Sequence, residues 1–255
     1  MNVISLSPVD LTIAAALVIV VAMLQWRMRL GNTKSLLIAA TRTILQLLLL
    51  GMVLKIVFAA SNLYWIALLS TIMLLAAGRE VMVRQKRRFI GSWGFLLGTS
   101  SMFVSAFSIT LLALLVIVQP EPWYLPQYSI PLLGMLLGNT LNGITLGLDS
   151  LTRNVWEQNS IIDGRLALGE TWSNAISDIR RDSIRVGMIP IINAMSVAGR
   201  VSWPGMMTGQ ILAGPPPLEA VKYQILILFL CAAGPGRGTI TAIGRGWRGL
   251  VVDRV

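Results

Sequence analysis

Long apolar stretches, separated by short polar intervals, make up most of this sequence. About 20 apolar residues are enough for a helix to cross the hydrocarbon core of a bilayer. The pattern therefore predicts an all-α, polytopic transmembrane bundle of about seven spans that forms one integral membrane domain over residues 1–255. The expected spans are residues 11–24, 36–59, 63–78, 89–118, 130–151, 188–213 and 220–234.

The longest polar interval, residues 162–190, lies between two groups of expected spans and overlaps the expected cytoplasmic coupling region at residues 152–187. It holds a small-residue turn, LALG at residues 166–169, and then a segment rich in charge and isoleucine. Apolar residues recur there at helical spacing, which predicts one amphipathic helix. They are Trp172, Ala175, Ile176 and Ile179. An apolar face outside the membrane needs a partner, and either a separate soluble subunit or the lipid headgroups would serve.

Composition supports a membrane protein and removes one class of partner. The chain is 55% hydrophobic and 13% charged, whereas soluble proteins carry roughly 25% charged residues. A net charge of +10 would suggest nucleic acid in a soluble protein. Here the basic residues gather in alternate intervals between spans, so membrane topology explains them and no nucleic-acid partner is expected.

Those basic intervals predict the orientation. They contain Arg27, Arg29 and Lys34; the five basic residues of 79–88; and Arg153, Arg165, Arg180, Arg181 and Arg185. The intervals between them, residues 1–8, 60–62, 119–128 and 214–219, contain none. By the positive-inside rule the N-terminus is outside and the C-terminus inside. Residues 1–8 lack a basic segment, so no cleavable signal peptide is expected.

Missing residue types exclude several chemistries. The sequence has no histidine and one cysteine, Cys231, so one chain cannot build a disulfide, a thiolate–metal cluster or histidine-based catalysis. It contains no GxxxxGK[ST], HExxH or GxSxG motif. We therefore expect no enzyme activity, no catalytic residues and no cofactor, with ATP hydrolysis on another chain if it is needed. Asp149 and Glu157 are more typical of a structural pair than of a catalytic one.

The expected fifth span carries unusual intramembrane residues. Its glycines form two GxxxG pairs, at positions 134 and 138 and at positions 143 and 147, which favour close helix approach. Asn139, Asn142 and Thr145 recur near helical spacing on one side. Amides are costly in lipid unless they bond across a helix interface or face water. They are therefore candidates for a substrate path, or they are polar contacts that hold helices together.

The expected sixth span is interrupted at residues 199–205. Pro204 and Gly205 favour either a broken helix, which can line a cavity, or a simple proline kink in one helix. Under the first interpretation both residues join the candidate substrate path.

Three motif blocks resemble the FetB-type family of ABC transporter membrane subunits. They are PLLGMLLGNTLNGITLGL, LALGETWSNAISDIRRDSIRVGMIP and WPGMMTGQILAG followed by PLEAVKYQILILFL, within residues 36–230. The family is similar to plant proteins linked to aluminium tolerance. The resemblance implies the permease half of an exporter in the bacterial inner membrane, acting on iron or a related metal species. It also implies a homodimer and a separate P-loop ATPase partner.

The resemblance further implies which residues face that ATPase. They are Leu168 and Gly169 in the turn, followed by Arg181, Asp182 and Arg185. The helical pattern adds Trp172 and Ile176 on the apolar face. The metal ligands stay unknown.

The chain departs from the family after Leu230. Residues 231–255 are rich in glycine and arginine and contain Pro235, a composition unfavourable for a helix in lipid. Residues 220–234 number only fifteen, short for a span. Either this end is genuine or the sequence is altered there, and the seventh span is in doubt.

Two further classes stay open. An ATP-independent channel or secondary carrier for a small ion or solute would need no polar docking helix. A membrane-embedded enzyme is disfavoured by the missing catalytic groups.

Overall fold

The computed structural model describes residues 7–60, 62–85 and 93–252, and this part of the chain is helical. The helices are α1 (Pro8–Arg27), α2 (Thr33–Ala60), α3 (Leu63–Arg84), α4 (Trp93–Met102), η1 (Phe103–Phe107), α5 (Ser108–Leu112), η2 (Ala113–Val118), α6 (Pro126–Glu157), α7 (Asn159–Ala167), α8 (Trp172–Ala175), α9 (Ser177–Val197), α10 (Gly205–Ala213) and α11 (Pro217–Val252). Extended pairing among the described residues is limited to an isolated bridge between Ala198 and Ser202. The predicted all-α class is confirmed.

Within residues 7–60, 62–85 and 93–252, six helical stretches are long and apolar enough to cross a membrane. They are Pro8–Arg27, Thr33–Phe58, Leu63–Arg84, Trp93–Val118, Pro126–Glu157 and Pro217–Trp247. The stretch from Trp93 to Val118 joins α4, η1, α5 and η2. α3 extends to Arg84, beyond the end of the expected span at residue 78. The basic interval at residues 79–88 is therefore helical up to Arg84, and residues 86–88 lie outside the described part of the chain.

The chain divides into two compact units, described here separately. Unit 1 comprises residues 1–61 and 212–214, and in it α1 packs against α2. A capping box starts α1: Ser7 Oγ accepts a hydrogen bond from the backbone N–H of Asp10, and the Asp10 carboxylate accepts one from the Ser7 backbone N–H at 2.8 Å. Nearly all described side chains of both helices are exposed, as expected for helices that face lipid.

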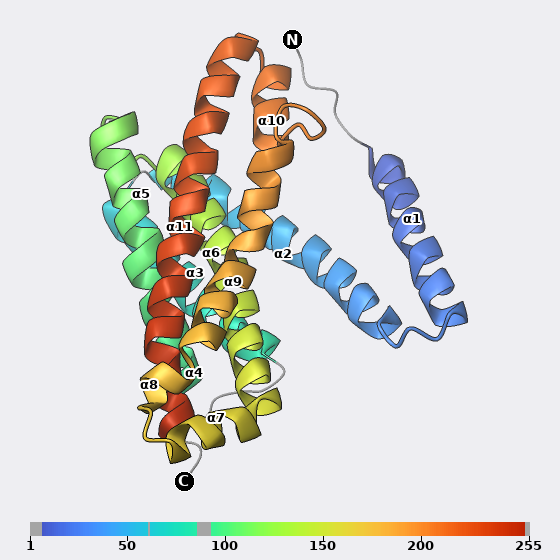
Figure 1. Cartoon of the computed structure of the whole chain (residues 1–255). Helices are drawn as coiled ribbons and strands as arrows, with labels where there is room; N and C mark the ends of the chain where they lie inside the picture. The colour runs from blue at the N-terminus through green and yellow to red at the C-terminus, as the bar shows by residue number, and fades with distance from the viewer. Residues whose placement is uncertain (1–6, 61, 86–92, 253–255) are drawn as a thin grey trace. The chain divides into compact units, whose positions relative to one another are not determined.

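Unit 2 comprises residues 62–211 and 215–255 and is organised around α6. α6 packs against α3, α9 and α11 (Figure 1). Its inward side chains Leu136, Ile144, Leu148 and Leu151 are fully buried. They belong to a hydrophobic core cluster that also includes residues of α3, α9 and α11.

Glycines let α6, α9 and α11 approach closely. A Cβ atom added to Gly187 of α9 would lie 2.7 Å from the carbonyl oxygen of Gly143. One added to Gly147 would lie 2.8 Å from Thr239 Cγ2 of α11. Close approach at the second GxxxG pair is therefore confirmed. In the first pair, Gly138 has no atom within 4 Å of such a Cβ.

The doubtful C-terminal stretch is a regular helix. α11 runs 36 residues without interruption, so the expected end of the span near residue 234 was wrong. Two of its glycines, Gly234 and Gly238, lie against α6: a Cβ on Gly238 would be 2.6 Å from Thr140 Cγ2. Arg237 and Arg245 lie on the exposed side. The small residues that make this stretch unfavourable as an isolated helix thus allow it to pack closely in the folded protein.

The expected sixth span is divided between two helices. α9 begins at Ser177, before the expected residue 188, and ends at Val197. Residues 198–204 are not helical, Gly199 has a φ of +76°, and α10 starts at Gly205. The broken-helix interpretation is confirmed over the simple proline kink.

Candidate functional site

The polar interval folds as two short helices and the first turns of α9, not as the single amphipathic helix expected. α7 ends at Ala167, and Gly169 follows with a φ of +91°. A left-handed backbone at this position stops a helix and suits glycine, which has no Cβ. α8 then occupies Trp172–Ala175 and leads directly into α9. The result is a compact helical hairpin, residues 159–185, which we call the coupling hairpin.

The tip of the coupling hairpin is exposed. Leu168 is 86% exposed, and Gly169, Glu170 and Thr171 beside it are exposed too. A leucine at the tip of a polar turn has no partner within the hairpin that buries it. It therefore forms a small apolar contact point ringed by polar atoms.

The apolar stripe of the hairpin faces inward. Ile176 is fully buried, Ala175 and Ile179 are buried, and the half-buried Trp172 packs against the same core. The partner that this stripe requires is thus the chain's own core. Trp172 and Ile176 anchor the hairpin, and the surface left for another subunit is its tip and its charged side.

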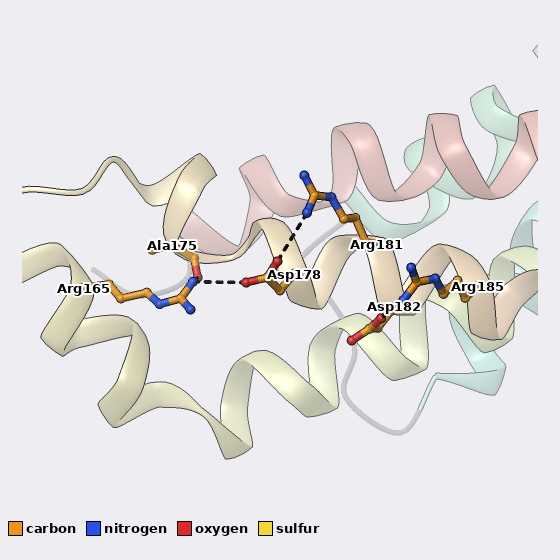
Figure 2. A network of polar contacts seen from close by, with 6 residues as sticks. All are labelled: Arg165, Ala175, Asp178, Arg181, Asp182 and Arg185. Atoms are coloured by element: carbon orange, nitrogen blue, oxygen red, sulfur yellow. Dashed lines mark hydrogen bonds and ion pairs between the residues drawn. The ribbon is translucent and has the colours of Figure 1, made fainter.

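Charged side chains brace the hairpin (Figure 2). Arg165 of α7 donates to the carbonyl oxygen of Ala175 at 3.2 Å and lies 3.5 Å from the Asp178 carboxylate. Asp178 is also 3.5 Å from Arg181. Arg165 therefore joins α7 to α8 and α9, although each exposed ion pair alone contributes roughly 0–1 kcal/mol.

Three expected ATPase-facing residues lie on the exposed side of α9. Arg181, Asp182 and Arg185 are exposed, and Arg185 pairs with Asp182 at 2.8 Å. They project from the same helix within one turn (Figure 2). This side combines both charge signs with long side chains, which suits a polar protein contact.

Sequence reasoning missed Arg180 as a link between helices. Its guanidinium donates to Ser173 Oγ at 3.2 Å and lies 5.7 Å from the centre of the Trp247 ring on α11. A guanidinium over an indole face is a favourable cation–π contact. The spacing along the sequence could not reveal it, because Trp247 is distant in sequence and falls in the stretch judged unfavourable as a helix.

The three candidate path residues of α6 differ in their hydrogen-bond partners. Asn139 Nδ2 donates to the carbonyl oxygen of Met135 at 2.9 Å and to Cys231 Sγ at 3.5 Å, between α6 and α11. Asn142 is exposed and accepts from Arg84 of α3 at 3.4 Å. Thr145 Oγ1 is buried with no hydrogen-bond partner among the described residues. This geometry favours an interhelical contact for Asn139 and an exposed polar position for Asn142.

Asn142 belongs to a polar row that joins α3 to α6. Arg84 Nε lies 3.4 Å from Glu80 Oε2, so one guanidinium joins Glu80 of α3 to Asn142 of α6. Ionisable groups inside membrane spans usually face a bundle interior or water. Pro204 and Gly205 lie instead at the start of α10, and none of the five candidate path residues lines the cavity beside that helix.

No bare-metal site is evident from residue types. Within the described residues, no group of three or more histidine, cysteine, aspartate or glutamate side chains could hold an ion. The described residues provide three features of functional interest. They are the exposed surface of the coupling hairpin, the polar row with Asn142 and a mainly apolar cavity beside α10.

Residues 8–250 match a protein-family model described as "Uncharacterised protein family (UPF0014)". The chain is 43% identical over 214 residues to the UPF0014 membrane protein slr1647 of Synechocystis, covering 82% of this chain and 80% of that relative. It is 32% identical over 234 residues to the Probable iron export permease protein FetB of Escherichia coli, covering 91% and 88%. It is 31% identical over 238 residues to Protein ALUMINUM SENSITIVE 3 of Arabidopsis thaliana, covering 92% and 84%.

No solved structure matches the chain. The apolar helices together with the bacterial membrane-protein relatives identify an integral membrane protein of the bacterial inner membrane. The predicted family and location are confirmed.

Proposed function

Because the chain belongs to the UPF0014 family of membrane proteins, we propose that it is the permease subunit of an ABC exporter for iron or a related metal species. The name of the Escherichia coli relative supports transport of iron. The observation that carries the ATP-driven part is the coupling hairpin, a braced and exposed structure beside the membrane helices.

The hairpin transmits motion as a lever. Leu168 and Gly169 at its tip contact the ATPase, and Arg181, Asp182 and Arg185 complete the contact from the exposed side of α9. Trp172 and Ile176 lock the hairpin to the core, so that movement of the tip moves α9 with it. Closure of an ATPase dimer would then shift α9 against α6 and α11.

Seven crossings are supported by the course of unit 2. α6 runs from a cavity at its first turn to the coupling hairpin at its end. α10 lines the same cavity, and α11 starts beside it. The chain must return from the hairpin to that cavity through α9, residues 198–204 and α10, which together make one broken crossing. With the basic intervals inside, the N-terminus is outside and the hairpin cytoplasmic.

Two copies of the chain form the transporter and enclose one pathway. The exposed polar row with Asn142 lies at membrane depth and needs water or protein over it rather than lipid. In this arrangement Asn142, Thr145 and the break at Pro204 and Gly205 line the pathway, and Asn139 supports it from the α11 side.

Co-purification tests the proposal. The chain is co-expressed with a candidate P-loop ATPase from the same genome, extracted in mild detergent and isolated through a tag on the permease. We expect a complex of two copies of each chain, with ATP hydrolysis stimulated by iron or another metal species. Metal transport by the chain alone, without ATPase, would identify a channel or secondary carrier instead.

A further inference from the structure

A cavity of about 360 Å³ lies where α6 and α11 begin. Its lining comes from η2, the start of α6, α10 and the start of α11, all within unit 2. Sites for small organic molecules occupy roughly 300–1,000 Å³. The cavity thus has the size of an organic ligand and is far larger than a bare ion.

The walls are mostly apolar, with a few polar groups. Leu132, Met135, Leu226 and their neighbours supply the apolar surface. The polar groups are Gln127, Tyr128, Gln210, Glu219 and Tyr223. An apolar enclosure with a few convergent polar groups is the usual composition of a ligand site, and tyrosine offers both a flat apolar ring and a hydroxyl.

Gln210 of α10 has an unsatisfied acceptor. Its Oε1 atom is buried and has no hydrogen-bond partner among the described residues. Leaving a buried acceptor unpaired is unfavourable, so such atoms usually have a partner. Gln210 itself lines the cavity, so a turn of its amide group would bring this oxygen to a ligand that donates an O–H or N–H bond.

The charge at the mouth of the cavity is balanced. Glu219 Oε1 lies 2.7 Å from Lys222 Nζ, and both side chains are more than half exposed. A smaller hollow of about 200 Å³ beside the cavity shares Val118, Glu219, Tyr223 and Leu226 with it and includes Lys222. The lining therefore selects for neither strongly cationic nor strongly anionic molecules.

We propose that this cavity binds a compact amphiphilic organic molecule with an apolar or aromatic body, at least one O–H or N–H donor and little net charge. A metal cargo would enter it inside an organic chelate, because the lining offers a single carboxylate and the sequence has no histidine. The binding site follows from the cavity itself, and its use on the export route rests on the proposed function.

Two fluorescent probes test the site. N-phenyl-1-naphthylamine is neutral, aromatic and has one N–H donor, and its N-methyl derivative lacks the donor. The full-length protein in lipid nanodiscs should bind both saturably above empty nanodiscs. Gln210→Leu should weaken the N–H probe about tenfold, the loss of one hydrogen bond, and leave the N-methyl probe unchanged. Gln224→Leu is the matched control: Gln224 Oε1 is also unpaired among the described residues but does not line the cavity.

A variant that fills the cavity with a larger side chain provides the second test. Leu226→Trp should abolish saturable binding of both probes, and Leu132→Trp serves if that variant does not fold. Absent saturable binding, or a Gln210→Leu effect that is equal for both probes, would overturn the proposal. The assay contains no ATPase, so a failure here is distinct from a failure to co-purify the ATPase.

Discussion

At the scale of residues, side-chain size sets the spacing of the central helices. The carbonyl oxygen of Gly143 approaches Gly187 so closely that no Cβ fits between α6 and α9 without movement. Membrane helices associate through such packing, because lipid provides little hydrophobic driving force between them. Two asparagines of α6 that look equivalent in the sequence also differ in their partners. Asn139 donates a hydrogen bond to Cys231 in the contact between α6 and α11, whereas Asn142 accepts one from Arg84 on the exposed side.

Gly187→Ala should therefore destabilise the protein by about 1–3 kcal/mol, the usual cost of overpacking. Gly138→Ala is the control, since a Cβ there meets nothing within 4 Å, and alanine favours the helix by up to about 1 kcal/mol. Thermal unfolding in detergent measures both. Equal melting temperatures for the two variants would contradict the close approach.

The two asparagines should respond differently to leucine. Asn139→Leu removes an interhelical contact and should cost roughly 1 kcal/mol of stability with transport per folded molecule unchanged. Asn142→Leu should leave folding intact and reduce transport, because it removes a polar partner of Arg84 from the proposed pathway. Metal-resistance growth normalised to membrane protein level separates the outcomes. Full resistance with Asn142→Leu would exclude it from the pathway.

At the scale of elements, the coupling hairpin has one buried and one exposed surface. Its buried stripe fastens it to the core, while its tip and the outer side of α9 remain exposed. The cation–π contact between Arg180 and Trp247 adds a link to α11. A lever needs this arrangement: a rigid attachment at one end and a free contact surface at the other.

Leu168→Asp and Ile176→Asp should consequently fail in different ways. Leu168→Asp should fold normally and lose ATPase binding or metal-stimulated hydrolysis, since only the exposed tip changes. Ile176→Asp places a charge in the core and should cost several kcal/mol of stability. Expression, melting temperature and co-purification distinguish the two. Retained ATPase coupling in Leu168→Asp would show that the tip is not the contact.

At the scale of the whole molecule, the proposed topology depends on one broken crossing. α9 is too charged in its first turns to qualify as a span by composition, so apolar length alone gives six spans in the part of the chain that the structure describes. Adding α10 gives a segment that returns to the cavity end of α6. Because this crossing follows the coupling hairpin in the chain, it decides on which sides of the membrane α11 begins and ends.

Cysteine labelling tests this topology. In a Cys231→Ser background, a cysteine replacing Glu121 should react with an impermeant maleimide from outside intact cells, whereas one replacing Glu170 should react only after permeabilisation. Both positions are exposed, so access is set by the side of the membrane. Outside labelling at position 170 would reverse the proposed orientation and remove the hairpin from any cytoplasmic ATPase.

The sequence by itself determined the class, the location and most membrane helices. Apolar length predicts spans because lipid forces the backbone to satisfy its own hydrogen bonds. It also predicted the break at residues 199–205 and the close approach at Gly143 and Gly147, which glycine and proline chemistry encodes locally. The candidate residues at the hairpin tip, Leu168 and Gly169, came from the motif resemblance and from the turn that a glycine allows.

Only the tertiary structure decided which faces are covered. The stripe with Ile176 was correctly recognised as apolar, yet helical spacing cannot say whether its partner is another subunit or the chain's own core. Gly234 and Gly238 lower helix propensity in isolation, but in the continuous helix α11 they allow close packing against α6. The cavity with Gln210 likewise joins segments distant in sequence. Burial and proximity depend on contacts between such segments, and local periodicity carries no information about them.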